Sequence, residues 1–385
     1  MSIRLPAADG GLRPYRPNTA PFAPLAHAPA RSRTFYAAAH VVADPLAASA
    51  EAGAVLDWGS TLAFRRRLWS QGLGVAEAMD TAQRGMGLDW PTAAELIRRS
   101  AAEARAVGGR IVCGAGTDQL EPGRTHSLDA ITRAYEEQLA HTEACGAGVV
   151  LMASRALARV ARGPEDYLEV YGALLRQSAG PVVLHWLGPM FDAELAGYWG
   201  HEDLDDAIEV FLKIIYESPG KVDGIKVSLL DAEREVGIRR RLPAGVRCYT
   251  GDDYHYPRLI AGDGELASDA LLGIFDPIAP IAARAALALD RDDQAGFREL
   301  LDPTVPLSRH LFTAPTRFYK TGVVLLAWLA GHQEHFVMVG GLQSGRSLPH
   351  LATAYELADA LGLFPDPELA EDRMRRLLSV YGVAS

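Results

Sequence analysis

The sequence has 385 residues, of which 49% are hydrophobic and 22% are charged, and its formal net charge is −10. This composition is ordinary for a globular protein, and the length suits one large domain with extensions or two medium domains. The negative charge argues against a general nucleic-acid-binding protein, whose surface would be basic. We therefore interpret the short basic clusters at residues 65–67 and 239–241 as solvated helix ends.

Residues 1–33 are rich in Ala, Pro and Gly and contain few periodic apolar positions. This pattern predicts an irregular, extended N-terminal arm that is disordered or wraps a neighbouring molecule.

From about residue 34 the sequence alternates between short apolar runs and amphipathic segments. Clear helical periodicity lies at residues 167–175, which follow Gly163-Pro164-Glu165-Asp166, and at residues 204–215. A further helix is predicted from about Ser127 to Cys145, ending at Gly146. Eight strands are predicted, at residues 36–42, 74–79, 110–113, 148–152, 182–187, 222–228, 246–250 and 270–275.

After about residue 277 the strand signal stops and helices are predicted at 278–289, 316–329, 350–361 and 367–380. Eight strands alternating with helices predict an α/β fold, a (β/α)8 TIM barrel with a helical C-terminal extension, and a doubly wound open sheet is the alternative. The expected domains are the arm at 1–33, the barrel at 34–292 and the extension at 293–385.

The number of cysteines and the length of the apolar runs indicate where in the cell the protein is expected. Cys113, Cys145 and Cys248 are too few and too scattered for a disulfide framework or a cysteine zinc site. No apolar run reaches the ~18–20 residues of a membrane span, and the N-terminus lacks a signal-peptide core. We expect a cytoplasmic protein with no membrane partner.

The run Val222–Ser228 predicts a buried strand that contains one lysine, Lys226. Because side chains alternate along a strand, Gly224, Lys226 and Ser228 share one face. A buried ammonium loses its hydration, so its pKa falls and part of the amine is neutral at pH 7. A neutral amine can attack a carbonyl group, which makes Lys226 a candidate nucleophile.

Further candidates lie where the other strands end, because catalytic groups of such barrels gather there. His185 on the fifth strand is expected to face inward and to shuttle protons. Gly251, Asp252 and Asp253 form a polar turn after the seventh strand, although Asp252 or Asp253 also suits a helix N-cap. Asp80 and Thr81 follow the second strand.

Three segments together resemble the dihydrodipicolinate synthase / N-acetylneuraminate lyase superfamily: residues 222–226, Tyr249-Thr250-Gly251-Asp252-Asp253 and residues 261–268. The resemblance implies a (β/α)8 barrel with a Schiff-base lysine on strand six, which Lys226 matches. By the same resemblance, His185 falls where the family has its proton-relay tyrosine. Asp80-Thr81-Ala82-Gln83 falls where the family has a loop of Gly-Thr-Thr-Gly type that holds a 2-keto acid carboxylate.

The leading hypothesis is a cofactor-independent lyase or aldolase, or a dehydratase, that acts on a keto acid or a sugar-derived keto compound. Its nucleophile is Lys226, its proton shuttle is His185, and the substrate-binding residues are Asp80, Thr81, Gly251, Asp252 and Asp253. Its partner is a small carbonyl compound, and the chain is expected to form a homo-oligomer.

Two other hypotheses stay open. A metal-dependent barrel isomerase or hydrolase would use His40, His185 and Asp253 as ligands, with Asp252 and His255 close by in sequence. A non-catalytic barrel that binds a sugar or acts as a regulator is the third.

Overall fold

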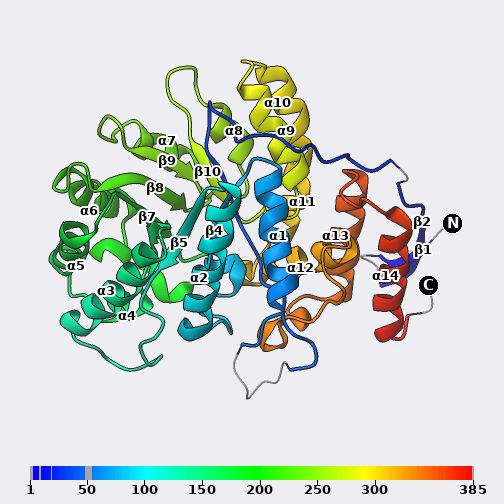
Figure 1. Cartoon of the computed structure of the whole chain (residues 1–385), viewed down its shortest axis with the longest axis horizontal. Coiled ribbons are helices and arrows are strands. Elements are labelled where there is room, and N and C mark those ends of the chain that lie inside the picture. The colour runs from blue at the N-terminus through cyan, green and yellow to red at the C-terminus, as the bar shows by residue number, and fades with distance from the viewer. Residues whose placement is uncertain (1–2, 8–9, 19, 48–53, 384–385) are drawn as a thin grey trace.

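The computed structural model describes residues 3–7, 10–18, 20–47 and 54–383. Its centre is a closed barrel of parallel strands in the order β10-β3-β4-β5-β6-β7-β8-β9 (Figure 1). The barrel strands are β3 (Phe35–Ala38), β4 (Gly74–Glu77), β5 (Ile111–Ala115), β6 (Gly148–Leu151), β7 (Val182–Leu187), β8 (Val222–Ser228), β9 (Arg247–Thr250) and β10 (Asp269–Leu272). The predicted TIM barrel is confirmed, and each predicted strand overlaps one barrel strand.

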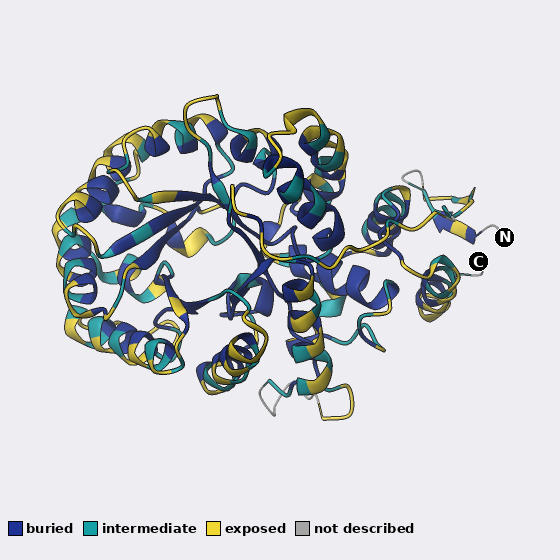
Figure 2. Cartoon of the chain, turned by 45° about the horizontal axis from the view of Figure 1, so that its top comes forward, coloured by how far each residue is buried: buried dark blue, intermediate teal, exposed yellow. Residues whose placement is uncertain are grey.

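Helices surround the barrel, and Figure 2 shows their outer faces exposed while the strands between them are buried. They are α1 (Trp58–Ser70), α2 (Trp90–Val107), α3 (Leu128–Ala144), α4 (Arg155–Val160), α5 (Pro164–Gln177), α6 (Leu204–Tyr216), α7 (Ala232–Arg239), α8 (Tyr256–Ala261) and α9 (Ala279–Leu289).

The starts of these helices follow from local sequence. The Ser127 hydroxyl accepts a hydrogen bond from the Ala130 N–H and caps α3. The Asp203 carboxylate caps α6 by accepting from two N–H groups of its first turn. Helix α5 begins with Pro164, whose missing N–H costs nothing there, and acidic residues follow near the positive end of the helix dipole.

The C-terminal extension consists of α10 (Gln294–Leu301), α11 (Val305–Leu311), α12 (Tyr319–Leu329), α13 (Leu348–Ala360) and α14 (Pro367–Val380). All residues of α12 are buried, because α11, α13 and α14 pack around it. A helix in such a central position is expected to be largely apolar, and α12 is so after its first three residues, Tyr319, Lys320 and Thr321. The domain boundaries at residues 33 and 292 stay predictions.

The N-terminal arm contains a short antiparallel sheet of β1 (Ile3–Pro6) and β2 (Leu12–Tyr15). The hairpin packs on α13, and the Tyr15 hydroxyl donates to Asp359 at 2.7 Å. Farther along, the Phe22 N–H donates to the Gly362 carbonyl at 2.7 Å, and the arm then crosses the barrel helices (Figure 1). We expected an arm that is disordered or wraps a neighbour. Its described residues form a strand pair and pack on their own chain, so disorder is wrong for them, and contact with a neighbouring molecule stays a prediction. Composition could not show this, because the contacts join opposite ends of the sequence.

The basic clusters at residues 65–67 and 239–241 were predicted to be solvated, but each contains a buried arginine. Arg65 is fully buried and forms two hydrogen bonds of 2.8 Å with the equally buried Glu77 of β4. Arg239 is 6% exposed and donates to the Leu259 carbonyl and to the Ser268 hydroxyl, each at 3.1 Å. Arg239 also lies 3.3 Å from the Asp263 carboxylate. The interpretation as solvated helix ends is therefore wrong for Arg65 and Arg239, because their carboxylate partners come from other elements.

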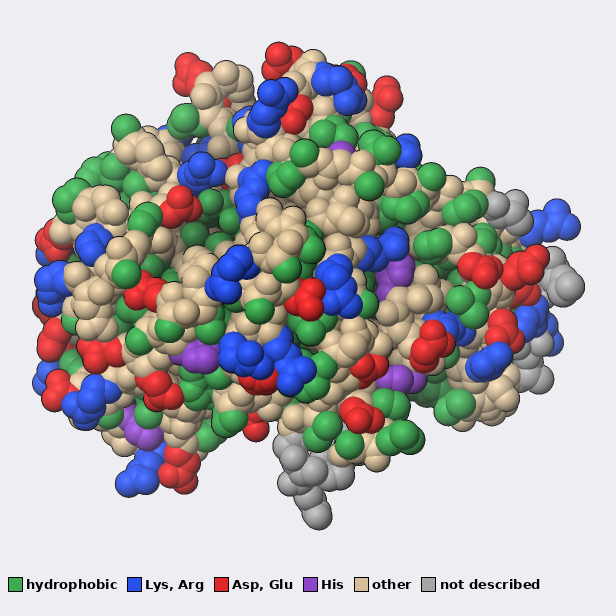
Figure 3. Space-filling view, viewed as in Figure 1, with side chains coloured by type: hydrophobic (Ala, Val, Ile, Leu, Met, Phe, Trp, Pro, Cys, Tyr) green, Lys and Arg blue, Asp and Glu red, His purple; other side chains and the backbone are tan. Residues whose placement is uncertain are grey.

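The face drawn in Figure 3 carries Lys and Arg side chains interspersed with Asp and Glu. In the described part of the chain, the helices are all too short or too polar to cross a membrane.

Candidate active site

Lys226 and His185 lie side by side on two neighbouring strands. Their Cα atoms are register partners in the β7–β8 pair, and both residues are buried. Val183, two residues before His185, belongs to the cluster inside the barrel, while Ile225 and Val227 pack with the outer helices. The alternation expected from sequence is thus confirmed, and both ionisable side chains face inward.

Gly251 at the end of β9 leaves the space that the lysine side chain occupies. A Cβ atom on Gly251 would lie 3.0 Å from the Lys226 Cε atom and 2.8 Å from the Val227 carbonyl oxygen, and would overlap the Ser228 hydroxyl. Contacts this short are repulsive, so a larger residue would displace the amine. The structure therefore gives Gly251 a role in shaping the site.

The environment of Lys226 favours the neutral amine. Burial lowers the pKa of Lys226 below its ordinary value of 10.5, although the negative charges of Asp80 and Asp253 act in the opposite direction. The effect of burial is the larger one, because a buried ammonium gives up its hydration. The neutral fraction of the amine is the form that can add to a carbonyl carbon.

His185 is a neutral imidazole in this setting. Burial, with a smaller contribution from the positive charge of Lys226, holds the pKa of His185 well below its ordinary 6.5. Its Nε2 atom lies 3.2 Å from the Ser228 hydroxyl, and its buried Nδ1 atom has no hydrogen-bond partner among the described residues. The tautomer in which Nε2 donates to the Ser228 hydroxyl leaves the lone pair of Nδ1 free to accept a proton from a bound molecule.

The two aspartates after β9 have different surroundings. Asp253 is buried near Lys226, accepts from the Ile274 N–H at 3.0 Å, and has its carboxyl pKa raised by burial. Asp252 accepts from the N–H groups of Tyr254 and His255, at 2.8 and 3.0 Å, and from the His255 ring at 2.9 Å. Asp252 thus stabilises the turn before α8. The N-cap residue of α8 is His255 and no side chain caps the helix, so the interpretation of Asp252 or Asp253 as its N-cap is wrong. Contact of Asp252 with a substrate stays a prediction.

Thr81 contacts a residue that the sequence analysis missed. Its hydroxyl lies 2.7 Å from the hydroxyl of Tyr319 at the start of α12, and both groups are buried. Burial raises the pKa of Tyr319 well above 10.0, and the negative charge of Asp80 adds to the effect. The helix at 316–329 was predicted, but its apolar run indicated core packing and concealed the tyrosine.

The next residue, Lys320, is a second buried lysine that sequence reasoning missed. It is 2% exposed, and its Nζ atom lies 3.3 Å from the Met86 sulfur. Burial lowers the pKa of Lys320 to about 8, with the charge of Asp80 opposing the shift. The sequence did contain a signal for Lys320, because a lysine inside a helix predicted to be apolar is unusual.

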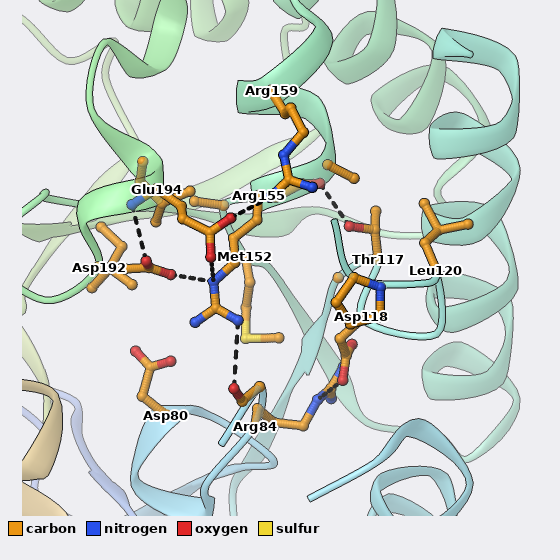
Figure 4. A pocket seen from close by; sticks show the side chains of 18 of the residues that line it. Asp80, Arg84, Thr117, Asp118, Leu120, Met152, Arg155, Arg159, Asp192 and Glu194 are labelled. Atoms are coloured by element: carbon orange, nitrogen blue, oxygen red, sulfur yellow. Dashed lines mark hydrogen bonds and ion pairs between the residues drawn. The ribbon is translucent and has the colours of Figure 1, made fainter. Parts of the chain in front are cut away.

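A cavity of about 320 Å³ opens beside these residues, lined by the segments that follow β4, β5, β6 and β7 (Figure 4). His185 and Asp80 reach its wall. Arginine–carboxylate pairs form much of the rest, namely Arg84 with Asp118, Arg155 with Asp192 and Arg159 with Glu194. The cavity lies where strands of a parallel barrel end, which is the usual position of barrel active sites.

The metal-ligand set considered from sequence is not assembled. His40 lies 2.7 Å from Asp276 through Nδ1 and 3.1 Å from the Gln333 side-chain oxygen through Nε2, so both ring nitrogens are occupied. Over the described ranges, no group of three or more His, Cys, Asp or Glu side chains could hold a metal ion. His40, His185 and Asp253 therefore do not form the expected site.

Fold and site together define a (β/α)8 barrel protein with a buried lysine on the sixth barrel strand. Three solved dihydrodipicolinate synthases share this fold. The enzyme of Bacteroides thetaiotaomicron superposes with a TM-score of 0.64 at 15% identity, covering 85% of this chain and 99% of that one. The enzyme of Aquifex aeolicus has a TM-score of 0.60 at 13% identity, and the match covers 91% of this chain and 98% of that one. The enzyme of Thermotoga maritima has a TM-score of 0.61 at 14% identity, and the match covers 91% of this chain and 99% of that one.

The resemblance to dihydrodipicolinate synthases is thus confirmed at the level of fold. Residues 3–383 match the family described as "Protein of unknown function (DUF993)", and the chain belongs to that family. The comparison with curated proteins finds no match.

Proposed function

We propose that this protein is a Schiff-base-forming lyase or aldolase, or a dehydratase, that acts on a keto acid or a sugar-derived keto compound through Lys226. The observation that carries the proposal is the inward pair of Lys226 and His185 on adjacent strands, of which His185 lines the cavity. The fold shared with dihydrodipicolinate synthases supports the same chemistry.

The reaction begins when the neutral Lys226 amine adds to the substrate carbonyl carbon. The carbonyl oxygen takes up protons and leaves as water, and an iminium ion remains. The iminium accepts the electron pair of an adjacent C–C or C–H bond as that bond breaks, giving an enamine. In C–C cleavage a hydroxyl group on the departing carbon loses its proton and that fragment leaves as an aldehyde or ketone; in C–H cleavage a base takes the proton. The enamine then takes up a proton or expels a hydroxyl group, and water hydrolyses the iminium to free Lys226.

His185 and the hydroxyl pair of Thr81 and Tyr319 are the groups proposed to move protons in these steps. The free Nδ1 atom of His185 can accept a proton, and the two hydroxyls at 2.7 Å can donate and accept in turn. Asp253, whose pKa burial raises, is a further proton donor close to Lys226. This chemistry requires no cofactor.

Asp80, Thr81, Gly251, Asp252 and Asp253 remain the proposed substrate-binding residues. A homo-oligomeric state and a cytoplasmic location also remain proposals.

Borohydride reduction tests the proposal, because it converts an iminium into a stable amine. The full chain is incubated with a panel of keto acids and hydroxyketones, reduced and weighed by mass spectrometry. We expect an adduct on the natural protein and on the control variant Lys221→Met. In the natural protein the Lys221 Nζ atom donates to the Ser178 carbonyl. Lys226→Met, which keeps a long apolar side chain, should form none, and a chelator should change nothing. No adduct with any carbonyl compound, together with full activity of Lys226→Met, would refute the proposal.

A further inference from the structure

Asp80 is an unpaired carboxylate at the wall of the cavity. Its side-chain oxygens form no hydrogen bond or ion pair with any described residue, and Figure 4 shows the carboxylate directed toward the space below Arg155. The other acidic residues of the cavity wall are each paired with an arginine: Asp118, Glu121, Asp192 and Glu194. Among the described carboxylates of this wall, Asp80 is therefore the one whose oxygens are free to accept hydrogen bonds from a ligand.

Asp80 also lies close enough to Lys226 to act on it. Its negative charge favours the ammonium form of Lys226 more than that of Asp253 does. It lies beyond strand β4, after Ala78 and Met79, as the first residue of the short turn Asp80–Ala82. His185, the register partner of Lys226, lines the same cavity as Asp80, so a carbonyl compound joined to Lys226 can extend toward this carboxylate.

The chemistry of a carboxylate decides which substituent is suitable. An ionised carboxylate only accepts hydrogen bonds, so it binds a hydroxyl group well and repels a second carboxylate. The remainder of the turn does not compensate for such repulsion. Ala82 has no polar side chain, and the Thr81 hydroxyl is already bonded to Tyr319.

Each arginine of the cavity wall has a carboxylate partner. Arg84 donates to Asp118, to the Gln138 side chain, and to the carbonyls of Ala78 and Gly114. Arg155 is held by Asp192 and Arg159 by Glu194. Hydroxyls of Thr117 and Ser154, 2.6 Å apart, complete a wall of mixed donors and acceptors. Such a wall suits a neutral compound with several hydroxyl groups.

We infer that Asp80 accepts a hydrogen bond from a hydroxyl group on the carbon next to the reacting carbonyl. The substrate is then a hydroxylated keto compound and not a 2-keto acid. This inference rests on the proposed function, since it assumes that Lys226 forms the iminium.

Two three-carbon ketones provide a direct test. Dihydroxyacetone carries a hydroxymethyl group beside the carbonyl where pyruvate carries a carboxylate. Each is incubated with the full-length protein and borohydride, and the rate of adduct formation on Lys226 is measured. For the natural protein we expect dihydroxyacetone to label Lys226 faster than pyruvate does.

The isosteric variant Asp80→Asn removes the charge and keeps the shape. It should lower the ratio of the dihydroxyacetone rate to the pyruvate rate by roughly tenfold. The hydroxyl of dihydroxyacetone loses its hydrogen bond to a charged group, and the carboxylate of pyruvate is no longer repelled. Asp129→Asn is the matched control, because Asp129 is an exposed residue of α3 whose side chain is 84% accessible, and its ratio should equal that of the natural protein.

The outcomes separate the inference from the proposed function. If the natural protein labels faster with pyruvate, or if Asp80→Asn slows both ketones equally, the inference is overturned while the Schiff base stands. If neither ketone labels Lys226, the inference is overturned, whereas the proposed function fails only if the whole panel of carbonyl compounds leaves Lys226 unlabelled.

Discussion

Replacing Gly251 with alanine tests whether the space around Lys226 is as tight as the structure indicates. The added methyl group would lie 2.8 Å from the Val227 carbonyl oxygen and 3.0 Å from the Lys226 Cε atom. The carbonyl cannot easily withdraw, because it accepts a hydrogen bond of 2.8 Å from the Gly251 N–H. The methyl group must therefore displace the lysine side chain, the strand end, or both.

Overpacking of this kind costs about 1–3 kcal/mol of unfolding free energy. A displacement of the amine by ~1 Å would also slow its reaction with a ketone by roughly a hundredfold. Urea unfolding measures the first effect, and borohydride trapping of a ketone measures the second.

The control is Gly180→Ala, where the new methyl group would meet no atom within 4 Å. It should change neither quantity. If Gly251→Ala matched Gly180→Ala in both stability and trapping rate, the packing argument for the site would be refuted.

Two further predictions concern buried ionisable groups. Burial raises the pKa of Glu235 from 4.5 to about 7, so the folded protein binds this proton more tightly than the unfolded chain and loses stability as the pH rises through that interval. Glu235→Gln should therefore be more stable than the natural protein at pH 8 by up to ~3 kcal/mol of unfolding free energy, with little difference at pH 4.5. Urea unfolding measures both proteins, and an equal pH dependence of their unfolding free energies would contradict this prediction. Tyr319→Phe removes the hydroxyl that contacts Thr81 and should slow the exchange of ketone α-hydrogens with D₂O by about a hundredfold, as NMR would show. The adduct on Lys226 should still form in Tyr319→Phe, and an unchanged exchange rate would remove Tyr319 from the proposed proton path.

Much of the barrel could be predicted because its signals are local. A strand such as β8 is a short run of apolar and β-branched residues, and alternation alone places Lys226 inward. The same rule placed His185, and the regular register of a parallel barrel then brought the two residues together. The polar turn that Asp252 stabilises was also visible, because turn chemistry depends on near neighbours.

The missed features depend on contacts between distant parts of the chain. Tyr319 reaches Thr81 across 238 residues, and nothing near either residue indicates that pairing. Lys320 lies in a helix whose apolar run predicts core packing, so its closeness to the site appears only in three dimensions. Arg65 looked solvated because its partner, Glu77, belongs to a neighbouring strand. The N-terminal arm gave no pattern of its own and is ordered by the C-terminal helices it contacts.

The central claim is that Lys226 forms the iminium, and locating the reduced adduct tests it most directly. The printed sequence contains four lysines, Lys213, Lys221, Lys226 and Lys320. An adduct on Lys226 would block trypsin there and yield a labelled peptide of residues 222–234, whereas one on Lys320 would label residues 318–346. Lys320 is the informative competitor, because it is buried and its pKa is lowered to about 8. We predict that the label lies in residues 222–234, and a label confined to residues 318–346 would contradict the account.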